Sequence, residues 1–216
     1  MIDRNYLDAI GWRGIRVRKA HLEQAIAYAA GRLREKNLPV HILDIAAGHG
    51  RYVIDAVARL PAKPEAILLR DYRDANVLAG TAMLEQAGLT NIAQFTQGDA
   101  FDEDDLASIT PAPTLAIASG IYELYNENNK LRSSLYGRAR VMTAGGFLIY
   151  TGQPWHPQLE FIARTLTSHR DGKAWVMRRR TQQELDQLVQ HSGFTKVEQW
   201  IDEWGIFTVS VAQRTK

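Results

Sequence analysis

The stretch at residues 41–52, HILDIAAGHGRY, constrains the fold more than any other part of the chain. Its apolar residues predict a short buried strand that ends at Asp44. Small residues follow at alternate positions, and a helical pattern begins directly after Gly50. A strand, a tight turn of small residues and a helix let backbone amides and a helix N-terminus approach a ligand closely. The stretch therefore predicts a ligand-binding turn, and the rest of the chain must indicate which ligand it binds.

Apolar runs separated by turn signals predict that strands and helices alternate along the chain. The expected strands are 40–44, 66–70, 92–96, 114–119, 147–151, 197–201 and 207–212. One helix is expected directly after the turn that follows the first strand, and it should end near residue 60. Further helices are expected at 74–86, 129–142, 158–168 and 182–191, the last one with a capping box. This alternation predicts a parallel sheet with helices on both faces. The short connection at 202–206 requires the last two strands to be antiparallel.

The N-terminal segment predicts two helices that precede the first strand. The first is expected at 3–11, and Gly11 and Gly14 are expected to break it. A longer helix with an apolar stripe is expected at 17–36. We interpret residues 1–38 as a helical lid segment and residues 39–216 as the main domain.

Composition excludes several classes of protein. A chain of 216 residues suits one α/β domain or a core with a lid. It has no cysteine, which excludes disulfides, thiolate metal sites and cysteine nucleophiles and fits a reducing compartment. The net charge of +2 is too small to indicate nucleic acid binding. The histidines lack ligand spacing, so no metal is expected.

Hydropathy along the chain predicts a cytoplasmic protein. No apolar run approaches the roughly 20 residues that a membrane span requires. The polar start of the sequence is unlike a secretory signal. These patterns leave peripheral contact with a membrane surface open.

Acidic or small residues follow each of the first four expected strands. Open parallel sheets bind ligands at the carboxyl ends of their strands. Asp71 lies about 20 residues after the glycine turn, the spacing at which an acid suits a ribose diol. Asp99 follows the third strand and could accept a hydrogen bond from an exocyclic amine such as that of adenine. Ser119 and Gly120 follow the fourth strand and leave room for a ligand against the backbone. The alternative is that the acids only cap turns.

Two common nucleotide sites do not fit this turn. The GxxxxGK[ST] pattern of triphosphate loops is absent. In a dinucleotide site, Asp44 would repel the pyrophosphate that the helix amides bind. An acid at this place suits a cationic group, such as an amine or a sulfonium.

These residues together resemble the class I S-adenosylmethionine-dependent methyltransferases. The segment 44–50 resembles the first motif of that family, with Ala46 in place of the usual first glycine. The resemblance implies a Rossmann-like seven-stranded α/β sheet with an antiparallel last strand, and S-adenosylmethionine as cofactor. In that family the acid at Asp71 holds the ribose and the acid at Asp99 holds adenine. The residues that the resemblance assigns to the cofactor are Asp44, Ala46, Ala47, Gly48, Gly50, Asp71, Tyr72, Gly98, Asp99, Ala100, Ser119 and Gly120.

A narrower resemblance involves the segments 5–16, 151–157 and 200–205. They are similar to a bacterial group of methyltransferase-like proteins that are often fused behind an α/β-hydrolase domain. This similarity implies a functional link to such a hydrolase, although no hydrolase domain is expected within the 216 residues. No Asn-Pro-Pro-Tyr stretch follows the fourth strand, which argues against methylation of DNA adenine or protein glutamine.

Two residues are candidates for the chemistry. Glu123 falls where several small-molecule O-methyltransferases carry a general base, although it could instead be a solvated or capping carboxylate. His156 lies in the loop after the fifth strand, and an imidazole suits proton transfer near neutral pH. The alternative for His156 is a hydrogen bond to the loop backbone.

Other residues are candidates for contact with the acceptor. The arginines at 178–180 precede a helix whose dipole they oppose, which suggests that they grip an anionic substrate group. The alternative is a solvated face or pairing with Asp202 and Glu203. Tyr6, Trp12 and Arg16 are expected to cover the methyl donor. The acceptor contacts that we predict are Arg16, Tyr122, Trp155 and Arg179.

The sequence therefore predicts methyl transfer from S-adenosylmethionine to a small-molecule or lipid-like acceptor that could be anionic. S-adenosylhomocysteine would be the product. One alternative is a module that binds these compounds without catalysis. RNA methylation, suggested by the arginines, is a second alternative, although the low net charge makes nucleic acid a poor partner.

Overall fold

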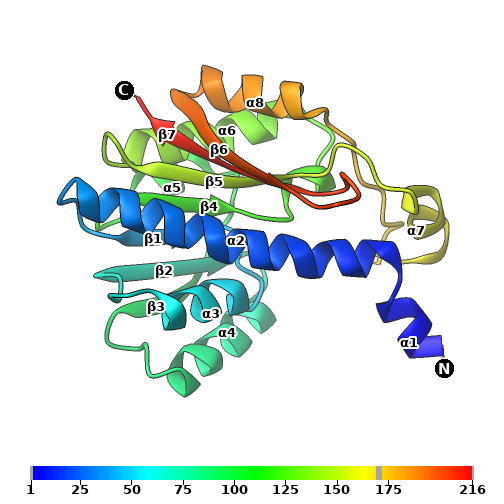
Figure 1. Ribbon diagram of the computed structural model, residues 1–216, viewed down its shortest axis with the longest axis horizontal. Coiled ribbons are helices and arrows are strands. Elements are labelled where there is room, and N and C mark those ends of the chain that lie inside the picture. The colour runs from blue at the N-terminus through cyan, green and yellow to red at the C-terminus, as the bar shows by residue number, and fades with distance from the viewer. Residues whose placement is uncertain (1, 169–171, 216) are drawn as a thin grey trace.

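The computed structural model describes residues 2–168 and 172–215, and they form a seven-stranded sheet (Figure 1). The strand order is β3-β2-β1-β4-β5-β7-β6. The strands are β1 His41–Asp44, β2 Ala66–Asp71, β3 Ala93–Gln97, β4 Leu115–Ala118, β5 Phe147–Gly152, β6 Phe194–Ile201 and β7 Thr208–Arg214. Strands β1 to β5 are parallel, and β7 runs antiparallel to β5 and to β6. The predicted sheet and its antiparallel final pair are confirmed.

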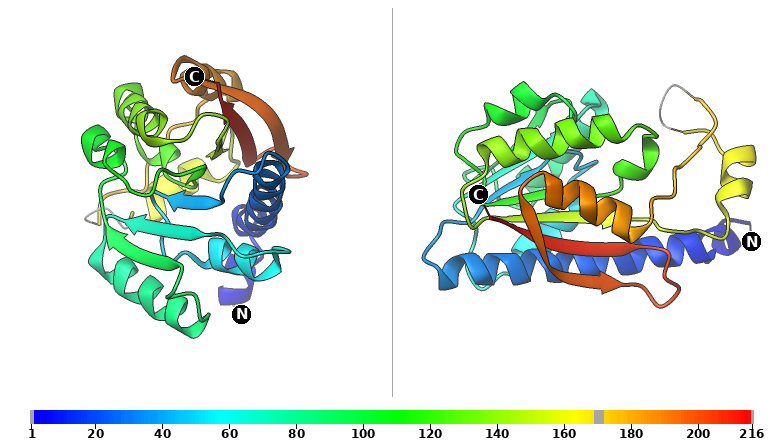
Figure 2. Two further views of the ribbon diagram at one scale, coloured as in Figure 1. Left: turned by 90° about the vertical axis from the view of Figure 1, so that its left-hand side faces the viewer. Right: turned by 90° about the horizontal axis from the view of Figure 1, so that it is seen from above.

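Helices cover both faces of this sheet (Figure 2). They are α1 Ile2–Leu7, α2 Ile10–Glu35, α3 Arg51–Arg59, α4 Asp74–Gln86, α5 Glu103–Ala107, α6 Asn128–Val141, α7 Leu159–Thr165 and α8 Gln182–His191, with a 3₁₀ turn η1 at Tyr122–Leu124. One core cluster joins the sheet to α2, α3 and α4, and a second joins it to α5, α6 and α8. None of the described helices is both long enough and apolar enough to cross a membrane.

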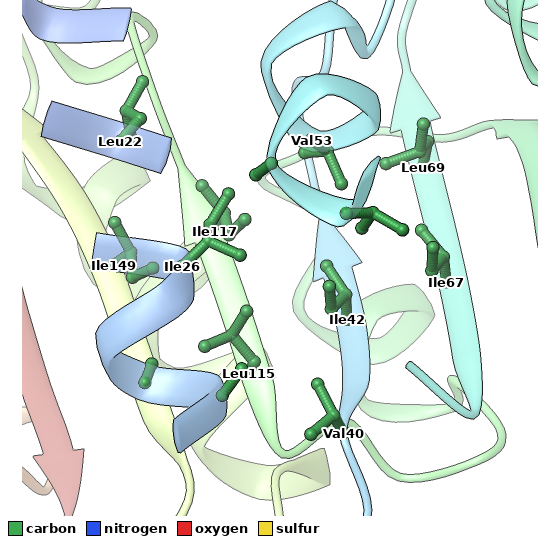
Figure 3. Close-up of a cluster of buried hydrophobic side chains, with 14 of the residues drawn as sticks. Leu22, Ile26, Val40, Ile42, Val53, Ile67, Leu69, Leu115, Ile117 and Ile149 are labelled. Atoms are coloured by element: carbon green, nitrogen blue, oxygen red, sulfur yellow. The ribbon is translucent and has the colours of Figure 1, made fainter. Parts of the chain in front are cut away.

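Alternation of side chains along the central strands explains the two clusters. Leu115 and Ile117 of β4 lie in the first cluster, whereas Ala116 and Ala118 lie in the second. Successive side chains of a strand point to opposite faces, so a strand that is covered on both faces is a continuous apolar run. Figure 3 shows the first cluster, in which Ile26 of α2 lies beside Ile117.

The helix α2 is continuous through both glycines that were expected to interrupt it. A Cβ atom on Gly11 would lie 2.6 Å from Nε2 of His156, and one on Gly14 would lie 2.9 Å from Cδ2 of Phe207. The prediction of a break was wrong because these glycines permit close packing of the helix against its neighbours rather than ending it. Residues 22–33, in the second half of α2, supply part of the first core cluster.

One further expectation about helices needs correction, and another is confirmed in part. Helix α7 ends at Thr165, earlier than expected. Thr181 caps α8, since its hydroxyl accepts from the N–H of Glu184 at 3.1 Å. The carboxylate of Glu184 contacts Asn128 and Arg178 and thus joins other elements.

We predict opposite effects for two glycine-to-alanine changes in α2. Glycine inside a helix is about 0.5–1 kcal/mol less stable than alanine. No atom lies within 4 Å of a Cβ on Gly31, so Gly31→Ala should raise the free energy of unfolding by that amount. Gly14→Ala should lower it by about 1–3 kcal/mol through overpacking against Phe207. Urea denaturation followed by circular dichroism measures both, and equal stabilisation by the two variants would contradict this packing.

Candidate functional site

The turn after β1 is held against the end of β2. Gly48 and Gly50 adopt positive φ angles of 60° and 71°, which favour glycine. The N–H of Gly48 donates to Oδ2 of Asp71 at 2.9 Å, and the N–H of Ala47 donates to the carbonyl of Arg70 at 2.8 Å. Helix α3 begins directly after Gly50. The turn and the acid after β2 thus form one hydrogen-bonded unit.

Asp44 is buried beneath this turn. The hydroxyl of Tyr52 donates to its Oδ2, and the N–H of Ala46 donates to its Oδ1 at 3.3 Å. Burial raises the pKa of Asp44 from its ordinary 3.8 to about 7, although both hydrogen bonds favour the charged form. Asp44 lines neither of the two cavities described below. The open carboxylate expected at this position is therefore covered, because the first turn of α3 places Tyr52 against it.

A cavity of about 960 Å³ lies at the carboxyl ends of the central strands, and we call it the strand-end cavity. Of the residues expected to hold the cofactor, it brings together Ala46, Asp71, Tyr72, Gly98, Asp99 and Ala100. Its opposite wall comes from Phe101, Ile121, Tyr125 and the beginning of α6. Ala47, Gly48, Gly50 and Ser119 do not line it.

Asp71 and Asp99, which line the strand-end cavity, differ in how many further hydrogen bonds their carboxylates can accept. Oδ1 of Asp71 accepts from the N–H of Arg73 at 3.0 Å and from Nδ2 of Asn76 at 2.9 Å, while its Oδ2 accepts from Gly48. A carboxylate has about four acceptor positions, so about one of them, on Oδ2, is left for a ligand. Asp99 is exposed, and among the described residues its carboxylate accepts at Oδ1 from the N–H of Phe101 at 2.9 Å.

A second cavity, of about 170 Å³, lies between the first half of α2, the 3₁₀ turn η1 and α7, and we call it the α2–α7 pocket. Its wall includes Tyr6, Trp12, Phe161, Trp175, Met177 and Phe207. It also contains Glu123, which is 8% exposed and pairs with Arg18 at 3.5 Å. Arg18 in turn lies over the ring of Phe207, 4.7 Å from its centroid.

His156 lines the same pocket, but only its Nε2 is left to contact a ligand, and Nε2 acts there as a donor. The N–H of Gln158 donates to Nδ1 of His156 at 3.0 Å. Burial lowers the pKa of His156, so the imidazole is neutral and its proton is on Nε2. A ring in this state has no free nitrogen lone pair with which to accept a proton. The base role expected for His156 is thus not favoured, and its hydrogen bond is to the loop backbone.

The linings of the two cavities adjoin where the chain leaves β4. Gly120 lines the α2–α7 pocket, and the next residue, Ile121, lines the strand-end cavity. The N–H of Gly120 donates to Oγ1 of Thr151 at 2.8 Å, which joins this exit to the end of β5. Both cavities therefore reach the carboxyl end of β4.

The structure places the expected acceptor contacts outside both cavities. Tyr122 is buried in the second core cluster, where its hydroxyl contacts Arg138 and Ser134. Nη1 of Arg16 donates to the carbonyl of Leu7 at 2.8 Å. Trp155 donates from Nε1 to the carbonyl of Trp204 at 3.1 Å.

Two of the three arginines at 178–180 bind other residues of the protein. Arg180 is buried and donates to the carbonyls of Tyr122 and Tyr125, both at 2.7 Å. Arg178 pairs with Glu184 at 2.6 Å. Arg179 is exposed and lines neither cavity. Arg178 and Arg180 therefore hold the loop after β4 in place, which corrects the expectation that they grip a substrate anion. The exposed position of Arg179 matches the alternative of a solvated face.

The expected alternative, pairing of these arginines with Asp202 and Glu203, does not occur either. The carboxylate of Asp202 accepts from the N–H groups of Trp204, Ile206 and Phe207 and so closes the turn between β6 and β7.

Sequence reasoning assigned no role to Gln153 or Gln158, which are polar residues of the α2–α7 pocket. Gln153 is 6% exposed, and its Nε2 is buried without a hydrogen-bond partner among the residues described. Its place directly after β5, at the carboxyl edge of the sheet, was a signal that could have found it. Within residues 2–168 and 172–215, no group of three or more acidic or histidine side chains could hold a metal ion.

The burial of Asp44 predicts a change of stability with pH. Its raised pKa means that the folded protein keeps a proton that the unfolded chain releases, so stability falls as pH rises between about 4 and 7. Asp44→Asn removes this titration. The free energy of unfolding of the variant relative to wild type should therefore grow by up to about 1.4 kcal/mol per pH unit across that range. Urea denaturation at a series of pH values measures it, and a constant difference would show that Asp44 is ionised throughout.

Solved structures share this fold at low sequence identity. The crystal structure of a possible exported protein from Bordetella parapertussis aligns with a TM-score of 0.75 and 15% identity, over 96% of this chain and 70% of that one. Magnesium protoporphyrin IX methyltransferase from Synechocystis, with bound SAH (S-adenosylhomocysteine), aligns with a TM-score of 0.66 and 14% identity, over 99% and 98%. At these identities the likeness establishes the fold.

Sequence comparison shows closer relationships. The uncharacterized protein YnbC of Escherichia coli K12 is 56% identical over 214 residues, which are 99% of this chain and 36% of that protein. The chain thus spans 36% of the length of this curated relative. Residues 1–214 match a family described as "Putative methyltransferase". Because that match covers nearly all of the sequence, the chain belongs to this methyltransferase family.

Proposed function

We propose that the protein transfers a methyl group from S-adenosylmethionine to a small-molecule or lipid-like acceptor. The observation that carries this proposal is that the linings of the strand-end cavity and the α2–α7 pocket adjoin at residues 120–121. Methyl transfer is an in-line displacement, and an enzyme promotes it mainly by holding both reactants in line. Two cavities whose linings adjoin would hold the methyl donor and the acceptor next to each other.

The strand-end cavity fits the methyl donor in size and in polar groups. Its volume of about 960 Å³ lies near the upper end of ligand sites, which span roughly 300–1,000 Å³. Asp99, whose Oδ2 accepts no hydrogen bond from the described part of the chain, would accept from the amine of adenine. Asp71, with about one acceptor position left, would take one ribose hydroxyl rather than both. The SAH bound to the Synechocystis methyltransferase supports this choice of ligand.

The chemistry requires a methyl group that is ready to transfer and, for a hydroxyl acceptor, a base. S-adenosylmethionine supplies an electrophilic methyl group on a sulfonium and leaves as a neutral thioether. We assign the base to Glu123, which lines the α2–α7 pocket. Oε1 of Glu123 lies 3.5 Å from Nη1 of Arg18, and a carboxylate in a pocket can accept a proton from a bound hydroxyl.

The lid proposal applies to α1 and the first half of α2. Tyr6 and Trp12 both line the α2–α7 pocket and meet edge to face, with ring centroids 5.6 Å apart. They would shield the acceptor from water. The functional link to an α/β-hydrolase and the cytoplasmic location remain predictions from sequence.

The donor assignment predicts that loss of the Asp71 carboxylate weakens nucleotide binding. Calorimetry should show one SAH site per chain. Asp71→Ala should raise its Kd at least tenfold, on the order of 1.4 kcal/mol, because the ribose loses an acceptor and the turn at Gly48 loses its anchor. Asp74→Ala is the matched control, since Asp74 is exposed and lines neither cavity.

Thermal unfolding of Asp71→Ala must accompany this titration, because the carboxylate also accepts from Arg73 and Asn76. A folded variant with unchanged affinity would refute the ribose assignment. No binding of SAH or S-adenosylmethionine to the wild-type protein would refute the proposed function.

A further inference from the structure

We infer that the α2–α7 pocket binds an uncharged acceptor with one aromatic ring and a hydroxyl group, that is, a phenol, and that Gln153 recognises its oxygen. As an assignment of the methyl acceptor, this inference rests on the proposed function. The binding of the ring itself depends only on the pocket. Charge, shape and one unpartnered amide carry the inference.

Among the described residues that line the pocket, the charges cancel each other. Glu123 and Arg18 form an ion pair at 3.5 Å, and His156 is neutral because burial lowers its pKa. Arg18 is also covered by the ring of Phe207. A buried anion is costly unless a cation is free to pair with it. The pocket therefore favours a neutral ligand, in contrast to the anionic acceptor that the arginines at 178–180 suggested.

The shape of the pocket suits a single ring. Its volume is about 170 Å³, and an apolar cavity of about 150 Å³ is known to admit benzene. Aromatic side chains such as Trp12 and Phe207 form much of its wall, and rings pack favourably against one another edge to face. Phe161 also lines the pocket but is 57% exposed, so it marks the mouth. A substituent on the ring could extend past Phe161 into solvent.

The amide of Gln153 supplies the specificity. It is buried, and within the described parts of the chain its Nε2 has no hydrogen-bond partner. An unsatisfied buried polar group is costly, and a rotation of the amide toward the pocket that Gln153 lines would let a ligand oxygen pair with it. Gln153 and Glu123 also line a small void of about 10 Å³ together, so the two residues lie close to each other.

A hydroxyl group matches this pair of side chains. Its oxygen can accept from Nε2 of Gln153 while its proton is donated to the carboxylate of Glu123. In the transfer, the bond between methyl and sulfur breaks, and its electron pair stays on the sulfur. The hydroxyl oxygen bonds to the methyl group, and its proton passes to Glu123. Charge and atoms balance without another reactant.

The test compares phenol with toluene, which has the same ring but no oxygen, and with benzoate, which is anionic. Ligand-observed NMR titration at pH 7, with and without SAH, measures each Kd. Phenol should bind the wild-type protein at least tenfold more tightly than toluene, and more tightly than benzoate. Gln153→Leu should reduce the phenol-to-toluene preference to about twofold or less, because no amide is then left unpaired.

Gln190→Leu is the matched control, because Gln190 is exposed on α8 and should leave the preference unchanged. If Gln153→Leu does not fold, Gln153→Met removes the amide at similar length. Tighter binding of benzoate, equal binding of phenol and toluene to the wild type, or an unchanged preference in the folded variant would overturn the inference.

The outcome also separates the inference from the proposed function. If SAH binds but phenol is not preferred, the acceptor class is wrong and the methyl donor assignment stands. If phenol is preferred but neither SAH nor S-adenosylmethionine binds, the pocket recognises phenols and the proposed function fails.

Discussion

The reversal of strand order between β1 and β4 is the constraint on which the site depends. β1 pairs with β2 on one side and with β4 on the other, so the connections that follow β1 and β4 lead to opposite sides of the sheet. Such a reversal opens a crevice beyond the strand ends. The small-residue turn after β1 lies on one side of the crevice, and the exit at 120–121 lies on the other. Both cavities take their position from this reversal.

Close packing of α2 adds the second half of the site. Two glycines let the helix approach His156 and Phe207, so its first half extends over the end of the sheet (Figure 1). Arg18 and Trp12 reach the α2–α7 pocket from this overhanging half, whereas residues 22–33 are fixed in the core. The pocket wall is thus rigidly attached to the sheet at one end. Bulkier residues at positions 11 and 14 would displace it.

Much of the fold and of the strand-end cavity could be predicted from sequence because the sequence signals for them are local. Apolar runs gave the strands, and Asp71 and Asp99 lie at the ends of two of them. The misplaced residues depend on partners that are distant in sequence. Gly11 is a breaker by local propensity, but tertiary packing against His156 overrides it. Arg180 reads as a surface cation, although its partners are carbonyls more than fifty residues away.

The chemistry of the acceptor pocket was the least predictable part, because burial decides the state of each group. The position of His156 suggested a base, but a backbone N–H on Nδ1 fixes the proton on Nε2. Gln153 carried no motif, and only its buried, unpartnered amide marks it. The resulting account divides the roles. In the proposed reaction Glu123 takes the proton and Gln153 orients the acceptor, whereas His156 forms part of the pocket wall.

A crystal structure of the protein with SAH would test the central claim most directly. The account predicts that adenine lies beside Asp99, that a ribose hydroxyl lies on Asp71, and that the sulfur lies at Gly120 and faces the α2–α7 pocket. SAH bound elsewhere, or in the strand-end cavity with its sulfur turned away from that pocket, would contradict the account.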